Sequence, residues 1–432
     1  MKLKKEKGLV ALSPLLILIV FIIIFTIYSV DKAESDPNLS LSVAFMISSI
    51  YAVIISGGLP MKKRIDTYSK GAGATNLMLM LWIYVLAGAF AASAKQMGAI
   101  DATVNLALQL LPTSLLLPGL FLAACFISIS IGTSVGTVVA LVPIAAGISQ
   151  STGFNPALMT ATIVGGAYFG DNLSFISDTT VVATQTQGCK MSDKFQVNFR
   201  IVAPSALLVL LCYWILGKSM ALPTVVPQVD YIKILPYLIV LATAVAGMNV
   251  MAVLTLGLVL CGLIGIACGD YNVYGWFSAM GDGVLGMGEL VIIAMMAGGM
   301  LEIIRENGGI DFIINKLTRR ITGKRGAELS IAALVSMVNV CTANNTVAIL
   351  TVGSISKKIG DRFGVDSRKA ASILDTFSCC VQGLIPYGVQ MLLAAGLSGL
   401  NPIQILSYLY YPMAIGIASL LAIIFRFPRK YS

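Results

Sequence analysis

Histidine is absent from the 432-residue sequence, and charged side chains are scarce. Without histidine, the chain lacks the commonest metal ligand and the side chain that most often carries protons near neutral pH. Any proton chemistry must therefore use carboxylates. Only 11% of the residues are charged, while 57% are hydrophobic, and so little charge does not cover the surface of a water-soluble domain. The composition indicates a membrane protein.

The eight cysteines form no CxxC pair, and most of them lie inside apolar segments. Neither a disulfide framework nor a zinc site is therefore predicted, and no cofactor is expected. The formal net charge of +9 does not indicate nucleic acid as a partner, because the basic residues lie in short stretches between apolar segments, as membrane topology requires. Membrane lipid is the expected partner instead.

Apolar runs of about 20 residues, the length of a helix that crosses a bilayer, recur along the chain. Basic residues concentrate in cytoplasmic loops, so the stretches 62–70, 190–200, 305–325 and 357–369 are predicted to lie on the cytoplasmic side. The lysines before the first run resemble the start of a secretory signal, but the run is too long and no cleavage site follows. We predict a multi-pass protein of the bacterial cytoplasmic (inner) membrane with both termini in the cytoplasm.

The two halves of the chain, 1–219 and 220–432, resemble each other. The block GTSVGTVVAL in the first half matches CTANNTVAIL in the second, so that Thr133 meets Thr342. Each half is predicted to contain about five transmembrane helices plus one re-entrant hairpin, and the odd number of crossings inverts the second half relative to the first. The predicted fold is thus an all-α membrane protein built as an inverted repeat. The predicted crossings are 9–29, 39–60, 75–94, 156–186, 232–246, 251–268 and 285–304, with hairpins at 115–148 and 329–355.

Four polar segments are predicted to break the helices at matched places in the two halves. They are rich in glycine, serine, threonine or asparagine and cover 132–136, 165–177, 341–345 and 380–386. Small polar residues in apolar segments often serve packing alone. Four matched breaks favour a site near the bilayer midplane, because unwound backbone there exposes carbonyl oxygens and half-helix ends that hold an ion.

Three carboxylates, Asp171, Asp178 and Asp375, lie within or beside these breaks. A carboxylate in a membrane segment is costly and is therefore a functional candidate. A desolvated carboxylate favours a proton and, when ionised, holds a hard cation, so Na+ and H+ would compete for it. Asp171 and Asp178 are the predicted Na+ ligands, although Asp178 also suits a cap on a helix beginning at Thr179. Further oxygen ligands are expected from Thr133, Ser174, Asn344 and Thr346.

The run GGAYFGDNLSFISDTT, from Gly165 to Thr180, resembles the signature of the NhaC-type sodium/proton antiporter family. GTSVGT resembles its TSxGT block, and residues 339–387 resemble its second hairpin and broken helix. The resemblance implies a fold of the ion transporter superfamily and a secondary active transporter, not an enzyme, that exchanges Na+ for H+ by alternating access at buried carboxylates. It also implies roles at the site for Ser174, Ser177, Thr179 and Thr180, together with Asp171, Asp178 and Asp375.

Departures from the family pattern leave the transported species open. Val135 stands where tryptophan is frequent, Asn172 where lysine is usual, Phe175 where proline is usual and Val181 where asparagine is usual. The resemblance also implies relatives of other function, because the same broad family includes malate/lactate exchangers and amino-acid carriers. The alternative function is therefore Na+- or H+-coupled transport of a small carboxylate or amino acid, which the uncharged pair Asn344 and Asn345 also suits.

Two other expectations concern the assembly and a different class of protein. A homodimer is compatible with the sequence. The membrane aspartates also suggest an intramembrane aspartyl protease, which needs two carboxylates close enough to share a proton. The inverted repeat gives no reason for such a pair, so protease activity is not predicted.

Overall fold

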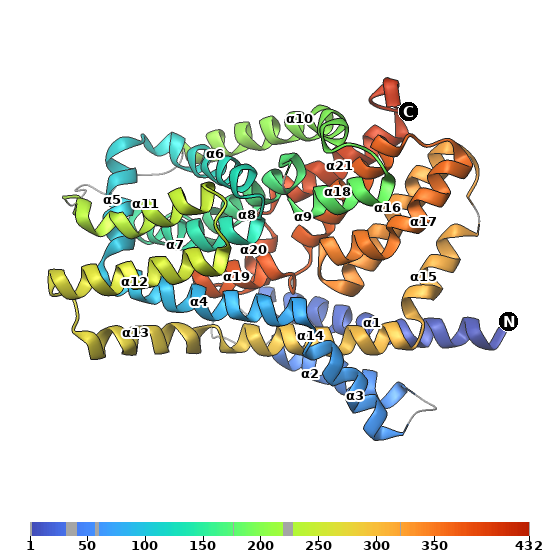
Figure 1. Ribbon diagram of the computed structural model, residues 1–432, viewed down its shortest axis with the longest axis horizontal. Helices are drawn as coiled ribbons and strands as arrows, with labels where there is room; N and C mark the ends of the chain where they lie inside the picture. Colours follow the sequence, from blue (N-terminus) through green and yellow to red (C-terminus); the bar gives the residue numbers. More distant parts are fainter. Residues whose placement is uncertain are drawn as a thin grey trace.

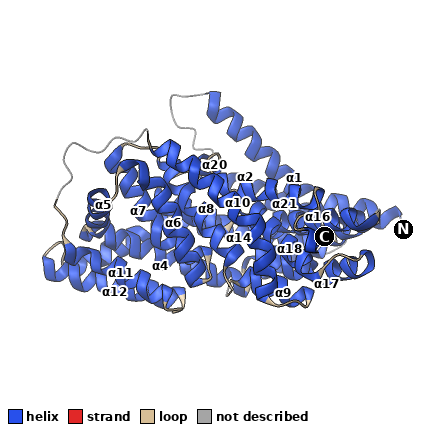
Figure 2. Ribbon diagram, turned by 90° about the horizontal axis from the view of Figure 1, so that it is seen from above, coloured by secondary structure: helices blue, strands red, loops and turns tan. Residues whose placement is uncertain are grey.

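The computed structural model describes residues 2–31, 41–56, 60–175, 177–218, 228–319 and 321–431, and within these ranges every regular element is a helix (Figures 1 and 2). The first half contains α1 (Lys2–Asp31), α2 (Leu41–Ile55), α3 (Met61–Ala72), α4 (Thr75–Met97), α5 (Ala99–Leu110), α6 (Thr113–Ile131), α7 (Ser134–Thr152), α8 (Pro156–Leu173), α9 (Asp178–Gln187) and α10 (Met191–Gly217). The second half contains α11 (Tyr231–Val245), α12 (Val250–Cys268), α13 (Val273–Gly286), α14 (Gly288–Glu306), α15 (Gly309–Thr318), α16 (Gly323–Thr342), α17 (Asn345–Phe363), α18 (Ser367–Leu384), α19 (Val389–Ser398), α20 (Pro402–Leu406), α21 (Tyr410–Ile424) and a 3-10 turn (Arg429–Tyr431).

Seven of the described helical stretches are long and apolar enough to cross a membrane. Large apolar side chains on these and shorter apolar helices, such as Trp82, Phe126 and Ile417, are more than half exposed on the outside of the molecule. Surface of this kind is stable only against lipid, so the chain is a multi-pass membrane protein. The seven stretches are Leu77–Met97, Ser114–Ile131, Ser134–Thr152, Met191–Gly217, Val250–Cys268, Val273–Glu306 and Ser367–Ser398.

The order of helices from α4 to α9 recurs from α14 to α19. A left-handed glycine separates α4 from α5 and another separates α14 from α15, at Gly98 and Gly308. Between α6 and α7 the extended N-cap is Thr133, with φ of −146°, and its counterpart between α16 and α17 is Asn344, with φ of −148°. The backbone therefore pairs Thr133 with Asn344.

The alignment of Thr133 with Thr342 is thus wrong by two residues. A short block of identical threonines decided that alignment, whereas equivalence in the fold depends on where each hairpin turns. The turn residues are Gly132 in the first hairpin and Ala343 in the second, both left-handed. The predicted division between residues 219 and 220 lies outside the described residues.

All four predicted breaks are longer than the observed ones. Helix α8 continues to Leu173 and α18 continues to Leu384, so the described non-helical residues are 174, 175 and 177 in the break after α8 and 385–388 in the break after α18. The glycines of α8 serve close packing against α6 instead. A Cβ atom on Gly166 would lie 2.6 Å from the Cβ atom of Ala124, and one on Gly170 would lie 2.1 Å from Ser128 Oγ.

Glycines also bring the two halves into close contact at the outer helices. A Cβ atom on Gly88 of α4 would lie 2.3 Å from the carbonyl oxygen of Gly283 on α13, and one on Gly283 would lie 2.2 Å from that of Gly88. Helices α3 and α14 meet in the same way at Gly71 and Gly298. Small residues let helix backbones approach closely in membranes, and here they join first-half helices to second-half helices.

Gly283→Ala is expected to destabilise the protein by about 1–3 kcal/mol, because the added methyl group overpacks the contact with α4. Its matched control is Gly281→Ala on the same helix, where nothing lies within 4 Å of the added atom. Thermal unfolding of the purified protein in detergent measures both. Equal melting temperatures for the two variants would contradict the close packing of α4 and α13.

Candidate functional site

The breaks between helices meet around a cavity of about 290 Å3. Figure 1 shows the helices α8, α9, α18 and α19 near the middle of the view. Four helices begin at the cavity wall, at Ser134 of α7, Asp178 of α9, Asn345 of α17 and Val389 of α19. The backbone N–H groups of a helix's first turn lack partners within the helix and favour negative charge. The cavity therefore combines helix N-termini with the carboxylates that line it.

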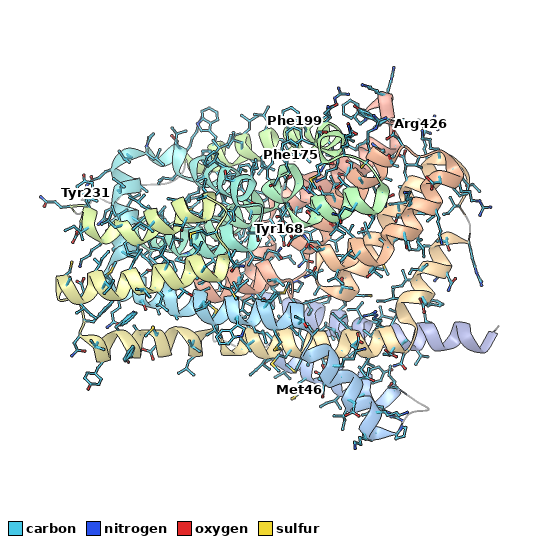
Figure 3. All side chains as sticks on the ribbon, viewed as in Figure 1. Met46, Tyr168, Phe175, Phe199, Tyr231 and Arg426 are labelled. Carbon is cyan, nitrogen blue, oxygen red and sulfur yellow. The ribbon has the colours of Figure 1, made fainter. Side chains whose placement is uncertain are left out.

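Asp171 is the buried carboxylate of this cavity and is 4% exposed. It lies near the end of α8, one turn after Tyr168, which Figure 3 labels in the interior of the molecule. The backbone N–H of Ser134, the first residue of α7, donates to Asp171 Oδ1 at 3.1 Å. The hydroxyls of Thr179 and Thr180 donate to the Asp171 carbonyl oxygen, each at 3.4 Å. The start of α9 is thus attached to the residue that carries the buried charge.

Asp178 is exposed and lines the same cavity. The alternative that it caps a helix beginning at Thr179 is wrong, because α9 begins at Asp178 itself and Ser177 is the N-cap. The Ser177 and Thr179 hydroxyls lie 3.0 Å apart. The cavity therefore contains one buried and one exposed carboxylate.

Eight of the eleven predicted site residues line the cavity, and Ser174, Thr180 and Asp375 do not. Ser174 lies outside it, and its hydroxyl donates to the carbonyl oxygen of Ile129 on α6 at 2.9 Å. Asp375 also lies outside it. The residues that the structure brings together are Thr133, Asp171, Ser177, Asp178, Thr179, Asn344, Asn345 and Thr346.

Asp375 is fully buried in an ion pair behind the cavity. Its Oδ2 atom lies 2.8 Å from Lys194 Nζ of α10 and accepts from the side-chain amides of Asn198 at 2.7 Å and Asn172 at 3.0 Å. Lys194 also donates to the carbonyl oxygen of Asn172 at 3.0 Å and to the hydroxyl of Thr180 at 2.6 Å. The chain thus has asparagine at 172, where the family pattern usually has lysine, and a lysine from another helix beside it.

The interpretation of Lys194 as a marker of a cytoplasmic loop is wrong, because its side chain is 1% exposed inside the helix bundle. Lys369 is likewise buried and donates to the carbonyl oxygen of Phe427. The positive-inside rule counts basic residues without regard to pairing. Lys194 and Asn198 are one helical turn apart, and this spacing of polar residues was the available signal for an inward-facing pair.

Two glutamines that the sequence did not predict as site residues also line the cavity, Gln382 of α18 and Gln390 of α19. Gln382 Nε2 donates to the Ala343 carbonyl oxygen at 2.9 Å and to Gln390 Oε1 at 3.2 Å. Gln390 Nε2 donates to Ser134 Oγ at 2.9 Å. Because the Ser134 N–H binds Asp171, these bonds form a chain from the second half to the buried carboxylate. Only the cost of burying a carboxylate was used to select polar side chains in the sequence, although a buried amide also needs hydrogen-bond partners.

Phe175 explains one departure from the family pattern. It lies in the break between α8 and α9, and its ring stacks on Phe195 of α10 with centroids 4.7 Å apart. Phe195 in turn stacks on Phe199 at 5.9 Å, and Figure 3 labels Phe175 and Phe199 near each other. The stack holds this break against α10, where a proline would offer no aromatic ring to stack.

The model of the Na+/H+ antiporter family matches residues 8–218 and matches again at residues 219–428. The chain belongs to the Na+/H+ antiporter family. The resemblance in GGAYFGDNLSFISDTT is thereby confirmed. This antiporter-family chain is 24% identical to the Na+/H+ antiporter NhaC of Alkalihalophilus pseudofirmus over 94% of each chain. It is 22% identical to NhaC of Bacillus subtilis over 96% of this chain and 97% of the relative.

Relatives of this antiporter-family chain also include proteins named for organic solutes. The malate-2H+/Na+-lactate antiporter of Bacillus subtilis is 20% identical over 83% of each chain. The arginine/ornithine antiporter ArcD of Halobacterium salinarum is 22% identical over 83% of this chain and 79% of its own. Among solved structures, the YdaH transporter of Alcanivorax borkumensis matches 90% of this chain and 99% of its own, with 13% identity and a TM-score of 0.44.

Within the described ranges, no three cysteine, aspartate or glutamate side chains gather as they would in a metal centre. The cavity lining instead offers Asp171 and Asp178 together with hydroxyl, amide and carbonyl oxygens. Such oxygens suit a hard cation that binds and leaves.

Proposed function

We propose that this chain is a secondary active transporter that exchanges Na+ for H+ by alternating access, with Asp171 as the exchange carboxylate. The observation that carries the proposal is the position of Asp171, which is buried, lines the cavity and receives the N–H of Ser134. The membership of the chain in the Na+/H+ antiporter family supports the choice of ions. Na+ and H+ are substrates, and no resident cofactor is proposed.

Exchange follows from competition at Asp171. The ionised carboxylate holds Na+, with neutral oxygens from Thr133, Ser177 and Thr179 completing the ligand set, and Asp178 provides a second negative charge at the cavity wall. A proton that binds Asp171 removes the charge that holds the cation, and Na+ then leaves. The empty ionised site has an unpaired buried charge, which is costly, so the carrier reorients when it holds either Na+ or H+.

The proposed architecture is an inverted repeat whose broken helices meet near the bilayer midplane. The recurrence of α4–α9 as α14–α19 supports the repeat, and broken helices at a repeat interface are the usual transporter site. We place the protein in the bacterial cytoplasmic membrane with both termini in the cytoplasm, since α3 carries exposed basic residues such as Lys62 and Lys63 and basic residues concentrate on the cytoplasmic side of membrane proteins.

A second candidate function is Na+- or H+-coupled transport of a small carboxylate or amino acid. The cavity of about 290 Å3 is much larger than a bare sodium ion, and four helix N-termini at its wall would attract a carboxylate group. The amide side chains of Asn344 and Asn345 add donors for such a solute. Two relatives carry the names of organic-solute antiporters.

Sodium alone is expected to drive protons out of proteoliposomes that contain the purified protein and a pH dye. The Na+ concentration for half-maximal response is expected to fall as the pH rises, because fewer protons then compete for Asp171. A panel of amino acids and dicarboxylates is added with Na+ in parallel. A response that begins only when one organic solute is present would contradict Na+/H+ antiport and support the second candidate.

A further inference from the structure

The two helix breaks at the cavity place different side chains at the same position of the repeat. Left-handed glycines precede α8 and α18, at Gly153 and Gly364, and end α9 and α19, at Gly188 and Gly399. In this register, Asp171 of the first half corresponds to Gln382 of the second. Each lies two residues before the last residue of its helix, and both line the cavity.

The orientation of the Gln382 amide follows from its partners. The Ala343 carbonyl oxygen accepts hydrogen bonds and donates none, so the nitrogen of Gln382 must face it, as the 2.9 Å bond shows. Ala343 is the left-handed residue at the turn between α16 and α17. The carboxamide oxygen consequently points away from this carbonyl group.

The oxygen of this amide has no hydrogen-bond partner among the described residues. Gln382 is only 1% exposed, and a buried carbonyl oxygen without a partner is unfavourable. The residue belongs to the cavity wall. Its oxygen therefore has unused acceptor capacity at the wall of a cavity that also contains Asp171 and Asp178.

We propose that the carboxamide oxygen of Gln382 is a ligand of the transported cation and the second-half counterpart of Asp171. This assignment rests on the proposed function, since it concerns the ion that Asp171 exchanges. The chain of hydrogen bonds through Gln390 and Ser134 to Asp171 fixes the two ligands relative to each other. Because an amide does not titrate, the second half contributes a permanent ligand, and only the first half changes its charge at this position.

Two substitutions at Gln382 distinguish a role of its oxygen as an ion ligand from a role of its nitrogen in the hydrogen bond to Ala343. Gln382→Met and Gln382→Glu both lose the amide donor to Ala343, but only the glutamate retains an oxygen at the end of the side chain. Gln382→Met is expected to raise the Na+ concentration for half-maximal exchange about tenfold, the effect of losing one bond to a charged group. Gln382→Glu is expected to keep Na+ binding and to move one additional proton per Na+, because the cavity gains a titrating group.

The measurements are Na+-driven dye response, the voltage dependence of exchange in vesicles with an imposed potassium potential, and Na+-induced thermal stabilisation of purified protein. Na+ stabilisation that is lost in Gln382→Met and retained in Gln382→Glu supports the proposal. Unchanged Na+ affinity in Gln382→Met would overturn it. An equal loss of Na+ affinity in both variants would also overturn it, because the loss would then come from the missing hydrogen bond to Ala343, which both variants lack. Wild-type protein that is stabilised by Na+ without moving protons would instead contradict the proposed antiport, and the stabilisation readout still decides the role of Gln382.

Discussion

Asp171→Asn is expected to abolish Na+-driven proton movement completely, to the level of empty liposomes. Asparagine retains a side-chain oxygen that accepts the N–H of Ser134, so the fold is expected to survive. The amide neither releases a proton nor carries the negative charge that holds Na+. The loss is measured as the absence of a dye response over a range of pH and Na+ concentration, in protein whose melting temperature is close to that of the wild type.

Asp178→Asn is the matched control for this experiment. Asp178 lines the same cavity but is exposed, so its charge is screened by water and contributes less to Na+ binding. Exchange is expected to persist with a weaker affinity for Na+. If Asp171→Asn retained exchange and Asp178→Asn abolished it, the assignment of the exchange carboxylate would have to be reversed.

Lys194→Met is expected to destabilise the protein by about 3–5 kcal/mol, because it leaves the buried Asp375 without its counter-charge. The double variant Lys194→Met/Asp375→Leu removes both charges and is expected to recover most of the loss. Thermal unfolding in detergent measures the series. The comparison pair is Lys70 and Glu302, 2.9 Å apart with Lys70 70% exposed, where Lys70→Met is expected to leave the melting temperature unchanged.

The same double variant tests whether Asp375 binds the ion, as the sequence predicted. With Lys194, Asn172 and Asn198 on one of its oxygens, Asp375 is more suited to joining α18 to α8 and α10. Exchange by the folded double variant would confirm this supporting role. A stable double variant without exchange would restore Asp375 as an ion ligand.

The sequence was sufficient for properties that depend on local composition. Scarce charge and long apolar runs predicted a helical membrane protein, and polar residues in those runs predicted the breaks after α6 and α16, whereas the breaks after α8 and α18 were predicted to begin several residues too early. The cost of a buried carboxylate selected Asp171, which the structure places at the cavity. The motif GGAYFGDNLSFISDTT indicated the family before any geometry was known, because it combines several of these polar positions in one segment.

Properties that depend on distant partners were not predictable in this way. Lys194 resembles any loop lysine until Asp375, far along the chain, is found 2.8 Å away. Gly166 and Gly170 resemble helix breakers until α6 is seen to pack against them. The register of the repeat depended on the turns at Gly132 and Ala343. These two residues share a left-handed backbone conformation but not a residue type, so the sequence alone does not pair them.

The glycine contacts between α4 and α13, and between α3 and α14, determine which parts of the molecule are able to move as units. Each contact joins a helix of residues 1–219 to a helix of residues 220–432 at backbone distance. A hinge between the two sequence halves would have to pull these backbones apart. Helices α3 and α4 are therefore expected to move together with α13 and α14, so that at least one rigid unit of the protein contains helices from both halves of the sequence.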